Sequence, residues 1–314
     1  MNSLEGNVEN SLESNLGAFE ALSAQLQGQV LADEPLWRHN SYRIGGKADF
    51  YIHLDCLSDI SRALELLEQH EISWVILGKG TNLLVSDLGY RGAVLVLGLE
   101  FKQFSISDEG ELVAGAAVLS SRLVQAAYTK GFGGLEVLAG VPGTLGGALA
   151  MNAGTKDEWI GSLVQSLVVY IPGKGLRRIQ GYEIDWYYRC SNLPRNAIIL
   201  EAVLQLKPCV KEELRAKMES LLNRRKRTQD LKYPSCGSVF VNPEGRSVGR
   251  LVEDLGLKGT SHGGAQISER HGNFIVNKGK ASAQDVLALI ALIKQKVGES
   301  YGIELSTEVK FLGF

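Results

Sequence analysis

Apolar residues recur along the chain with two different spacings, which predict strands in some segments and helices in others. Short apolar runs, several alternating with polar residues, predict strands at 48–54, 73–77, 93–97, 103–107, 112–116, 165–171, 197–206 and 304–311. Apolar residues three or four positions apart predict helices at 57–70, 120–130, 211–227, 248–255 and 281–301. Because strands and helices mix along the whole chain, the pattern predicts an α+β fold.

The order of these elements divides the chain into consecutive parts. Residues 1–31 are rich in Asn, Ser, Glu and Gln and are predicted to be an N-terminal tail, although residues 16–26 have the spacing of a short amphipathic helix. We expect a first lobe at 32–100, a second lobe at 101–207 and a third region at 208–304. The last strand, within 305–314, can return to the second lobe.

Composition narrows the class of protein. The chain has 314 residues, 45% of them hydrophobic, which is enough for two or three packed domains. A formal net charge of −2 does not indicate the basic surface that nucleic-acid-binding proteins usually have. No apolar run is long enough to span a bilayer. Four scattered cysteines and five histidines without ligand spacing predict neither a disulfide framework nor a metal site. Without a signal-peptide pattern at the N-terminus, we expect a cytoplasmic protein.

A glycine-rich stretch, GVPGTLGGALAMNAG at 140–154, is the strongest local signal for ligand binding. Gly140, Gly143, Gly146 and Gly147 leave backbone amides bare, and such amides can line a concavity that holds phosphate. Thr144 can cap a short helix over 146–151 and so add the positive end of a helix dipole. The structural alternative is a tight turn between a helix and a sheet.

A second candidate cradle, Gly78-Lys79-Gly80-Thr81-Asn82, follows the apolar run at 74–77. It is not a dinucleotide fingerprint, because Leu83 replaces the third glycine, and no P-loop ending is present. Gly115 precedes the helix at 120–130 and marks another close approach of the backbone. Two cradles together predict a ligand that contains a diphosphate and a long body.

Three side chains are candidates for chemistry. Arg189 follows three aromatic residues, which favours a guanidinium held on a ring face, and a structural cation–π contact is the simplest interpretation. Ser238 lies between Gly237 and an apolar run and lacks the G-x-S-x-G pattern of a hydrolase nucleophile. Glu308 lies in the predicted strand 304–311, where a solvated face is the alternative.

Further polar residues allow two interpretations each. Arg225 belongs to a basic helix end, Arg224 to Arg227, which either complements the helix dipole or binds phosphate. Gln266 and Asn273 have amides that could bind a sugar or a uracil, or could cap local backbone.

Several motifs in order make the chain resemble the UDP-N-acetylenolpyruvoylglucosamine reductase (MurB) family from about residue 36 to the C-terminus. Besides the two glycine loops, they are NSYRIGG at 40–46, YRCS at 188–191, GSVF at 237–240, GAQIS at 264–268 with 271–277, and EVKF at 308–311. The resemblance implies a two-lobed FAD-binding fold of the vanillyl-alcohol-oxidase type, with lobes at 32–100 and 101–207, and an α+β substrate-binding domain at 208–304.

The resemblance also implies a reaction, in which NADPH reduces noncovalently bound FAD and the enolpyruvyl ether of a UDP-sugar is then reduced to UDP-N-acetylmuramate. It gives Ser238 the role of proton donor, and Arg189 and Glu308 the stabilisation of the enolic intermediate. The implied substrate-binding residues are Arg225, Gln266, Asn273 and Lys310. The implied FAD-binding residues are Arg43, Gly45, Gly78, Lys79, Gly80, Thr81, Asn82, Gly115, Gly140, Val141, Pro142, Gly143, Thr144, Gly146, Gly147, Asn152, Ala153 and Gly154.

Some positions depart from the family pattern. Val241 stands where relatives usually have Lys or Arg, and Lys310 where Arg is common. The short segment 191–198 leaves no room for a tyrosine-bearing insertion, so the chain is similar to the shorter subgroup. We expect a monomer. A flavin-binding sensor of nucleotide sugars and a flavin oxidase of sugar alcohols are the alternatives; the intact catalytic trio disfavours the sensor, and the lack of a motif for covalent flavin attachment disfavours the oxidase.

Overall fold

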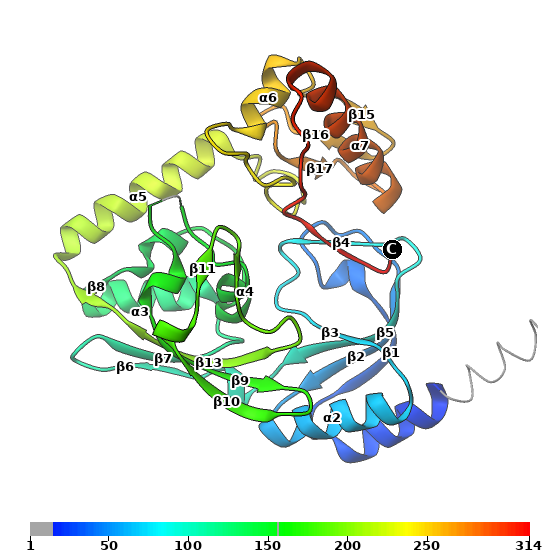
Figure 1. Cartoon of the computed structure of the whole chain (residues 1–314), viewed down its shortest axis with the longest axis vertical. Coiled ribbons are helices and arrows are strands. Elements are labelled where there is room, and N and C mark those ends of the chain that lie inside the picture. Colours follow the sequence, from blue (N-terminus) through cyan, green and yellow to red (C-terminus); the bar gives the residue numbers. More distant parts are fainter. Residues whose placement is uncertain (1–14, 156) are drawn as a thin grey trace, which may run out of the picture. The chain divides into compact units, whose positions relative to one another are not determined.

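The computed structural model describes residues 15–155 and 157–314, which form two compact units (Figure 1). Unit 1 contains the described residues up to Glu34, together with Ala48–Gly78 and Arg91–Glu219. Unit 2 contains Pro35–Lys47, Lys79–Tyr90 and Ser220–Phe314. The segment 32–100, predicted as one lobe, therefore contributes to both units, because two of its loops pack with the C-terminal third of the chain.

The first sheet of unit 1 has the strand order β1-β2-β5-β3. Its strands are β1 (Val30–Pro35), β2 (Lys47–Leu54), β5 (Tyr90–Leu97) and β3 (Trp74–Ile76). Two helices pack against it, α2 (Leu57–Gln69) and a helix over 15–25 (Figure 1). Ala18 and Leu22 of this helix are buried in the same core as Leu67. The second half of the predicted tail is therefore a docked helix, while residues 1–14 lie outside the described part.

The second sheet of unit 1 is antiparallel, with the order β10-β9-β13-β7-β6. Its strands are β10 (Gly175–Gln180), β9 (Val164–Ile171), β13 (Ile198–Gln205), β7 (Glu111–Gly115) and β6 (Phe104–Ile106). The helices α3 (Ser120–Lys130) and α4 (Leu145–Ala150) share its core. The predicted hairpin at 172–175 joins β9 to β10.

The core of unit 2 is a small sheet, β15-β16-β17, covered by two helices (Figure 1). The strands are β15 (Ser261–His262), β16 (Ala265–Ile267) and β17 (Ile275–Asn277), and the helices are α6 (Val248–Asp254) and α7 (Ala283–Tyr301). Ser282 caps α7 in a reciprocal pair with Asp285. The sequence predicted both helices but missed the sheet, because strands of two or three residues are too short to show alternation.

The C-terminal segment corrects one prediction. Regular strand β18 covers only Lys310–Leu312, and it pairs in parallel with β4 (Leu83–Val85). The residues before β18 are bound through single bridges such as Phe240 to Thr307. The segment therefore joins residues of the first predicted lobe and not the second, to which the sequence analysis allowed it to return.

The helix α5 (Lys211–Thr228) is mostly exposed, and Leu214 is its buried residue. The remaining elements are short: β8 (Phe132–Gly133), β11 (Trp186–Tyr187), β12 (Cys190–Ser191), β14 (Lys207–Pro208), η1 (Leu36–Arg38), η2 (Glu100–Lys102), η3 (Leu135–Leu138), η4 (Ile160–Leu163) and η5 (Gly181–Glu183).

Candidate cofactor and substrate sites

The glycine loop at 140–154 lies in unit 1 and begins directly after η3. Gly140 and Gly143 have φ values of 72° and 136°, which only glycine adopts readily. Thr144 is the N-cap of α4, and its Oγ1 accepts a hydrogen bond of 3.3 Å from the amide of Gly147. The predicted cap is therefore confirmed. The helix begins at Leu145, one residue before the start predicted from the sequence.

Some amides of this loop are used within the protein. The Gly146 amide donates to the Ala116 carbonyl over 2.8 Å, and Gly147 donates to Thr144. Val141 and Ala153 donate to Leu138 and Ala148, respectively. A phosphate cradle would therefore depend on the amides of Gly140, Gly143 and Thr144. The amides of Gly146 and Gly147, which were also predicted to be available, already have partners within the protein.

The two predicted cradles meet inside unit 1. A Cβ atom placed on Gly78 would lie 2.8 Å from Thr144 Oγ1. Any side chain at Gly78 would therefore fill the space above the start of α4. This bare backbone beside a helix N-cap fits the diphosphate of a dinucleotide. Gly115 is required for a different reason, because its Cβ would collide with the Phe101 carbonyl.

The rest of the second cradle lies in unit 2, beside the 40–46 motif. The Gly80 carbonyl accepts hydrogen bonds from the Ser41 amide at 3.0 Å and from Ser41 Oγ at 3.2 Å. Asn40 shapes the turn, since its Nδ2 donates to Leu36 and Ile44 carbonyls at 2.7 and 2.8 Å. Arg43 is held in this turn at a φ of 56°. The structure thus joins the 40–46 turn, which contains Arg43 and Gly45, to Gly80 through Ser41, with Lys79, Thr81 and Asn82 in the same unit.

Arg189 lies between β11 and β12 in unit 1, at a φ of 62°. Its Cζ is 4.8 Å from the centroid of the Tyr188 ring. Its Nη1 donates to the Gly154 carbonyl over 3.3 Å. The predicted placement of the guanidinium against a ring is confirmed, and the glycine loop provides a second contact that fixes its direction.

Asn152 connects the glycine loop to the Arg189 hairpin. Its side chain is buried, with Nδ2 donating to the Tyr187 carbonyl over 2.8 Å and Oδ1 accepting from the Gly161 amide over 3.1 Å. The sequence predicted a cofactor contact for this residue, and that contact stays a prediction. The observed role is to hold the backbone two residues before Arg189.

Ser238 and Glu308 are brought together in unit 2. Ser238 follows Gly237, whose φ is 81°, and forms a bridge with Phe274. On the other side, the Glu308 amide donates to the carbonyl of Val239 over 2.8 Å. Both side chains are half-buried. The sequence placed them 70 positions apart, and the structure makes them neighbours on adjacent extended segments.

A residue of the predicted FAD loop also contacts this segment. Asn82 Nδ2 donates to the Glu308 carbonyl over 3.1 Å, and the Lys310 amide donates back to the Asn82 carbonyl over 3.1 Å. Lys310 is the first residue of β18, and its side chain is exposed. Within unit 2, the second cradle therefore fixes the backbone that carries Glu308.

Two predicted substrate residues bind local backbone. Asn273 is 2% exposed, and its amide makes two hydrogen bonds with Phe240, accepting from its N–H at 2.9 Å and donating to its carbonyl at 2.8 Å. Gln266 Nε2 donates to the Gly259 carbonyl at 3.0 Å and to Ser261 Oγ at 3.2 Å. Both observations match the capping alternative. Their substrate contacts stay predictions, and for Asn273 a role in holding the Ser238 segment is more direct.

Arg225 is the predicted phosphate ligand whose surroundings fit an anion. Its Nε donates to Gln229 Oε1 over 3.2 Å, while Nη1 is buried and has no hydrogen-bond partner among the described residues. Burial lowers the pKa of this guanidinium. A buried guanidinium N–H without a partner is costly, and an anionic ligand would satisfy it.

A buried pair of residues, Tyr42 and Cys236, was not predicted from the sequence. Tyr42 is fully buried, and burial, with the nearby Cys236 as a smaller cause, raises its pKa well above the usual value. Burial raises the pKa of Cys236 to about 12, and the charge of Glu308 adds to the shift. The Cys236 thiol therefore stays protonated at neutral pH. The signal available was that Tyr42 lies within the 40–46 motif.

Two further observations limit the kinds of site. Among residues 15–155 and 157–314, no group of three His, Cys, Asp or Glu side chains could hold a metal ion. Within the same residues, no helix has the length and apolar character needed to cross a membrane.

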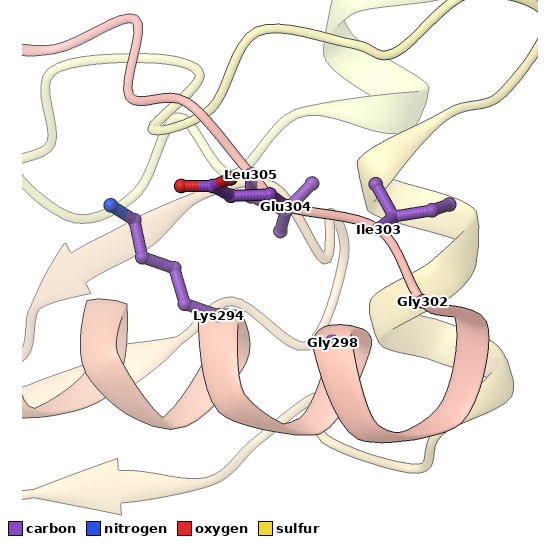
Figure 2. Close-up of a pocket in the computed structure, with 6 residues that line it drawn as sticks. All are labelled: Lys294, Gly298, Gly302, Ile303, Glu304 and Leu305. Atoms are coloured by element: carbon purple, nitrogen blue, oxygen red, sulfur yellow. The ribbon is translucent and has the colours of Figure 1, made fainter.

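A cavity of about 370 Å³ lies in unit 2 at the C-terminal end of α7. Lys294, Gly298 and the segment from Gly302 to Leu305 line it. Figure 2 shows the Lys294 and Glu304 side chains extending toward the same end of the cavity, away from Ile303. It contains none of the predicted site residues.

These features define an FAD-binding protein with a separate C-terminal domain. Residues 48–171 match the family profile described as FAD binding domain. Residues 229–312 match the profile for the C-terminal domain of UDP-N-acetylenolpyruvoylglucosamine reductase. The predicted fold class and the FAD cofactor are therefore confirmed.

Whole-chain relatives identify the family. The chain is 40% identical over 294 residues to a UDP-N-acetylenolpyruvoylglucosamine reductase of Heliobacterium modesticaldum, covering 93% of both chains. It is 40% identical to that of Bacillus pumilus over 94% of this chain and 97% of the relative. The crystal structure of the Thermus caldophilus reductase (MurB) matches with a TM-score of 0.79 and 34% identity, over 91% of this chain and 99% of the other. The chain belongs to the UDP-N-acetylenolpyruvoylglucosamine reductase family.

Proposed function

We propose that the protein reduces the enolpyruvyl ether of UDP-N-acetylglucosamine to the lactyl ether, giving UDP-N-acetylmuramate for peptidoglycan synthesis. NADPH is the hydride donor and FAD the bound cofactor. The observation that carries the proposal is the juxtaposition of Ser238 and Glu308, in a chain of this family, on segments joined by the Glu308 to Val239 hydrogen bond. An acid and a carboxylate placed this way suit the protonation of a carbon next to a substrate carboxylate.

The reaction adds one hydride and one proton across the carbon–carbon double bond of the enolpyruvyl group. When bound, FAD would supply the hydride-transfer chemistry that links NADPH to the substrate methylene carbon. Gly78, Gly143 and the N-cap of α4 would hold its diphosphate, because bare amides and a helix start favour anions. Asn82 would help to hold the loop at 78–82 in place, because its side chain binds the Glu308 carbonyl.

Arg189 is proposed to bind the substrate carboxylate. Its guanidinium is fixed by the Tyr188 ring and by the Gly154 carbonyl, so its direction does not depend on the substrate. A fixed guanidinium pairs well with a carboxylate and stabilises the negative charge that grows there as the enol forms. Preorganisation of this kind is worth more than the same pair formed in water.

Ser238 is proposed to donate the proton to the carbon that bears the carboxylate. Its Oγ–H bond breaks as the new C–H bond forms, and the hydroxyl regains its proton from solvent between turnovers. A serine hydroxyl is a weak acid, so charge stabilisation by neighbouring groups is required. Glu308 lies on the adjacent segment and is proposed to stabilise the enolic intermediate with Arg189.

The test separates the two half-reactions by stopped-flow absorbance of the flavin. In Ser238→Ala, reduction by NADPH should keep its rate, while reoxidation by the enolpyruvyl substrate should fall roughly a hundredfold to ten-thousandfold. Ser238→Cys should keep part of the reoxidation rate, because a thiol can also donate a proton. Wild-type reoxidation in the alanine variant, or loss of NADPH reduction instead, would mean that Ser238 is a packing residue.

We further propose that the chain acts as a monomer in the cytoplasm, without nucleic acid or membrane partners. All four cysteines are free, which fits a reducing compartment. Light scattering of the FAD-loaded protein at micromolar concentration should give a mass near the 34.1 kDa of one chain. A stable dimer mass would contradict the monomer.

A further inference from the structure

Lys217, in the first half of α5, joins two carboxylates that flank the glycine loop. Its Nζ lies 2.9 Å from Glu136 Oε1 and 2.6 Å from Glu158 Oε1. Glu136 precedes Gly140 by four residues, and Glu158 follows Gly154 by four residues. A single ammonium group therefore holds both ends of the loop.

The Glu136 side of this contact is well ordered by the fold. Its side chain is 10% exposed, and its Oε2 accepts a hydrogen bond of 2.6 Å from the Gly134 amide. Its own carbonyl accepts from the Ala139 amide over 2.8 Å, which closes the turn that leads into Gly140. Although burial opposes ionisation, the hydrogen bonds from Lys217 and from backbone amides leave the pKa of Glu136 below its usual value.

The Glu158 side reaches the loop through the backbone. The Glu158 carbonyl accepts from the Thr155 amide over 2.7 Å, and Thr155 Oγ1 accepts from the Glu158 amide over 3.2 Å. Gly154 packs so closely on the Glu158 carbonyl that a Cβ atom would collide with it. The carbonyl of Gly154 in turn accepts from Arg189. Displacement of Glu158 would therefore be passed to Arg189 through Gly154.

The first half of α5, which carries Lys217, is fixed in unit 1. Leu214 is buried and lies against Gly133, where a Cβ atom would be 3.1 Å from Leu214 Cδ2. Met218 packs against the core of the second sheet. Lys217 thus extends from an anchored turn of α5, from which its ammonium can hold the glycine loop.

We propose that Lys217 is a positioning residue that clamps both ends of the loop at 140–154 and prepares it to bind FAD. The inference rests on the proposed function, which places FAD at this loop. Gly140 and Gly143 lie outside α4, and the backbone freedom of glycine at such positions must be lost when the loop holds a ligand. A clamp that orders the loop beforehand removes part of that cost from the binding step.

The experiment measures the Kd of FAD for deflavinated full-length protein, by flavin fluorescence, with the melting temperature of the same apo samples. In Lys217→Met we expect the Kd to rise about tenfold, since breaking a partly buried three-membered ion network leaves two carboxylates without their cation. Lys217→Arg should restore most of the affinity. The matched control is Arg215→Met, which removes the Arg215 to Glu219 ion pair of 2.8 Å from the same helix and should leave the Kd unchanged.

A second variant keeps the test decisive if Lys217→Met folds poorly. Glu158→Gln removes only the more exposed contact of the clamp and should raise the Kd roughly threefold, and it should add little to Lys217→Met in the double variant. If Lys217→Met lowers the melting temperature but leaves the Kd at the wild-type value, Lys217 is merely structural and the inference is wrong. A wild-type protein that does not bind FAD would overturn the proposed function as well, so the two failures are distinguishable.

Discussion

Replacing Asn152 should test whether the glycine loop positions Arg189. Asn152 is 4% exposed, and its amide joins the Tyr187 carbonyl to the Gly161 amide over 2.8 and 3.1 Å. Its φ of 39° lies in the left-handed region, which asparagine tolerates better than alanine. The variant Asn152→Ala therefore removes two hydrogen bonds and adds backbone strain at the same time.

The expected loss of stability can be worked out from these contacts. The Gly161 amide is buried and would lose its partner, which costs about 1–3 kcal/mol. The Tyr187 carbonyl belongs to an exposed residue and can turn to water, so its lost bond costs about 1 kcal/mol. An alanine at positive φ adds about 1 kcal/mol. Together, the free energy of unfolding should fall by about 3–5 kcal/mol.

The variant Asn152→Gly separates the backbone from the side chain. Glycine adopts this φ without strain, although it loses about 0.5–1 kcal/mol of extra entropy on folding. The two effects nearly cancel, so we expect it to be at most about 0.5 kcal/mol more stable than the alanine variant in urea unfolding followed by tryptophan fluorescence. Both variants should keep NADPH reduction of the flavin, and reoxidation by the enolpyruvyl substrate should fall on the order of a hundredfold, as expected when a positioned group moves by about 1 Å.

Two outcomes would refute this reasoning. Wild-type stability in both variants would show that the two hydrogen bonds of Asn152 contribute nothing to folding. Unchanged reoxidation, in a variant whose stability falls as expected, would show that Arg189 is positioned without the hairpin contact. The direct contact to Gly154 would then be sufficient to fix the guanidinium.

Three further substitutions have predicted effects on stability or on FAD content. Asn273→Ala should lower the unfolding free energy by about 2–4 kcal/mol in denaturant titrations, because both backbone groups of Phe240 lose their partners, and an unaffected midpoint would contradict it. Gly143→Val should abolish FAD content in the visible spectrum, since its φ of 136° is closed to a branched residue; full occupancy would mean that the cofactor lies elsewhere. Because the pKa of Glu136 is lowered on folding, its contribution to stability is present above the unfolded value near 4.3 and lost as the pH falls through the folded value. Glu136→Gln should therefore be less stable than wild type at pH 7 and show a weaker dependence between about pH 5 and pH 3 in thermal melts.

Elements with strong local signals could be predicted from the sequence. The helix predicted at 120–130 matches α3 at both ends, because Gly131 ends it in the left-handed conformation with a φ of 79°. Thr144 as an N-cap was predicted for the same kind of reason. In each case the decisive residue lies within one turn of the element that it limits.

Elements that depend on distant partners could not be predicted in this way. Alternation at 304–311 indicated a strand, but only Lys310–Leu312 is regular, because its partner β4 has just three residues. The strands β15 and β16 are equally short and were missed. Pairing between short segments far apart in the sequence leaves little periodic pattern to detect.

The candidate site shows the same difference between contacts with sequence neighbours and contacts with distant residues. Aromatic neighbours in the sequence were sufficient to predict the ring contact of Arg189. The amides of Asn152 and Asn273 gave no such indication, since an amide can donate and accept almost anywhere. Their partners, Tyr187 and Phe240, lie 35 and 33 residues away. The residue types therefore predicted polar contacts correctly, but only the fold decides whether backbone or ligand provides them.

The glycine loop at 140–154 has contacts at both ends that bear on the two proposed half-reactions. Its N-terminal part, with Gly143 and the Thr144 cap, fits a cofactor diphosphate, while its C-terminal part holds Arg189 through Asn152 and Gly154. A steady-state rate cannot assign a defect in this loop, because weaker FAD binding and a displaced Arg189 both lower turnover. The two effects differ in their response to FAD. Excess FAD reverses a defect caused by weaker FAD binding, whereas a displaced Arg189 lowers turnover even at full FAD occupancy. Rates of flavin reduction and reoxidation, measured at saturating FAD, are therefore the measurement that distinguishes which part of the loop a substitution has damaged.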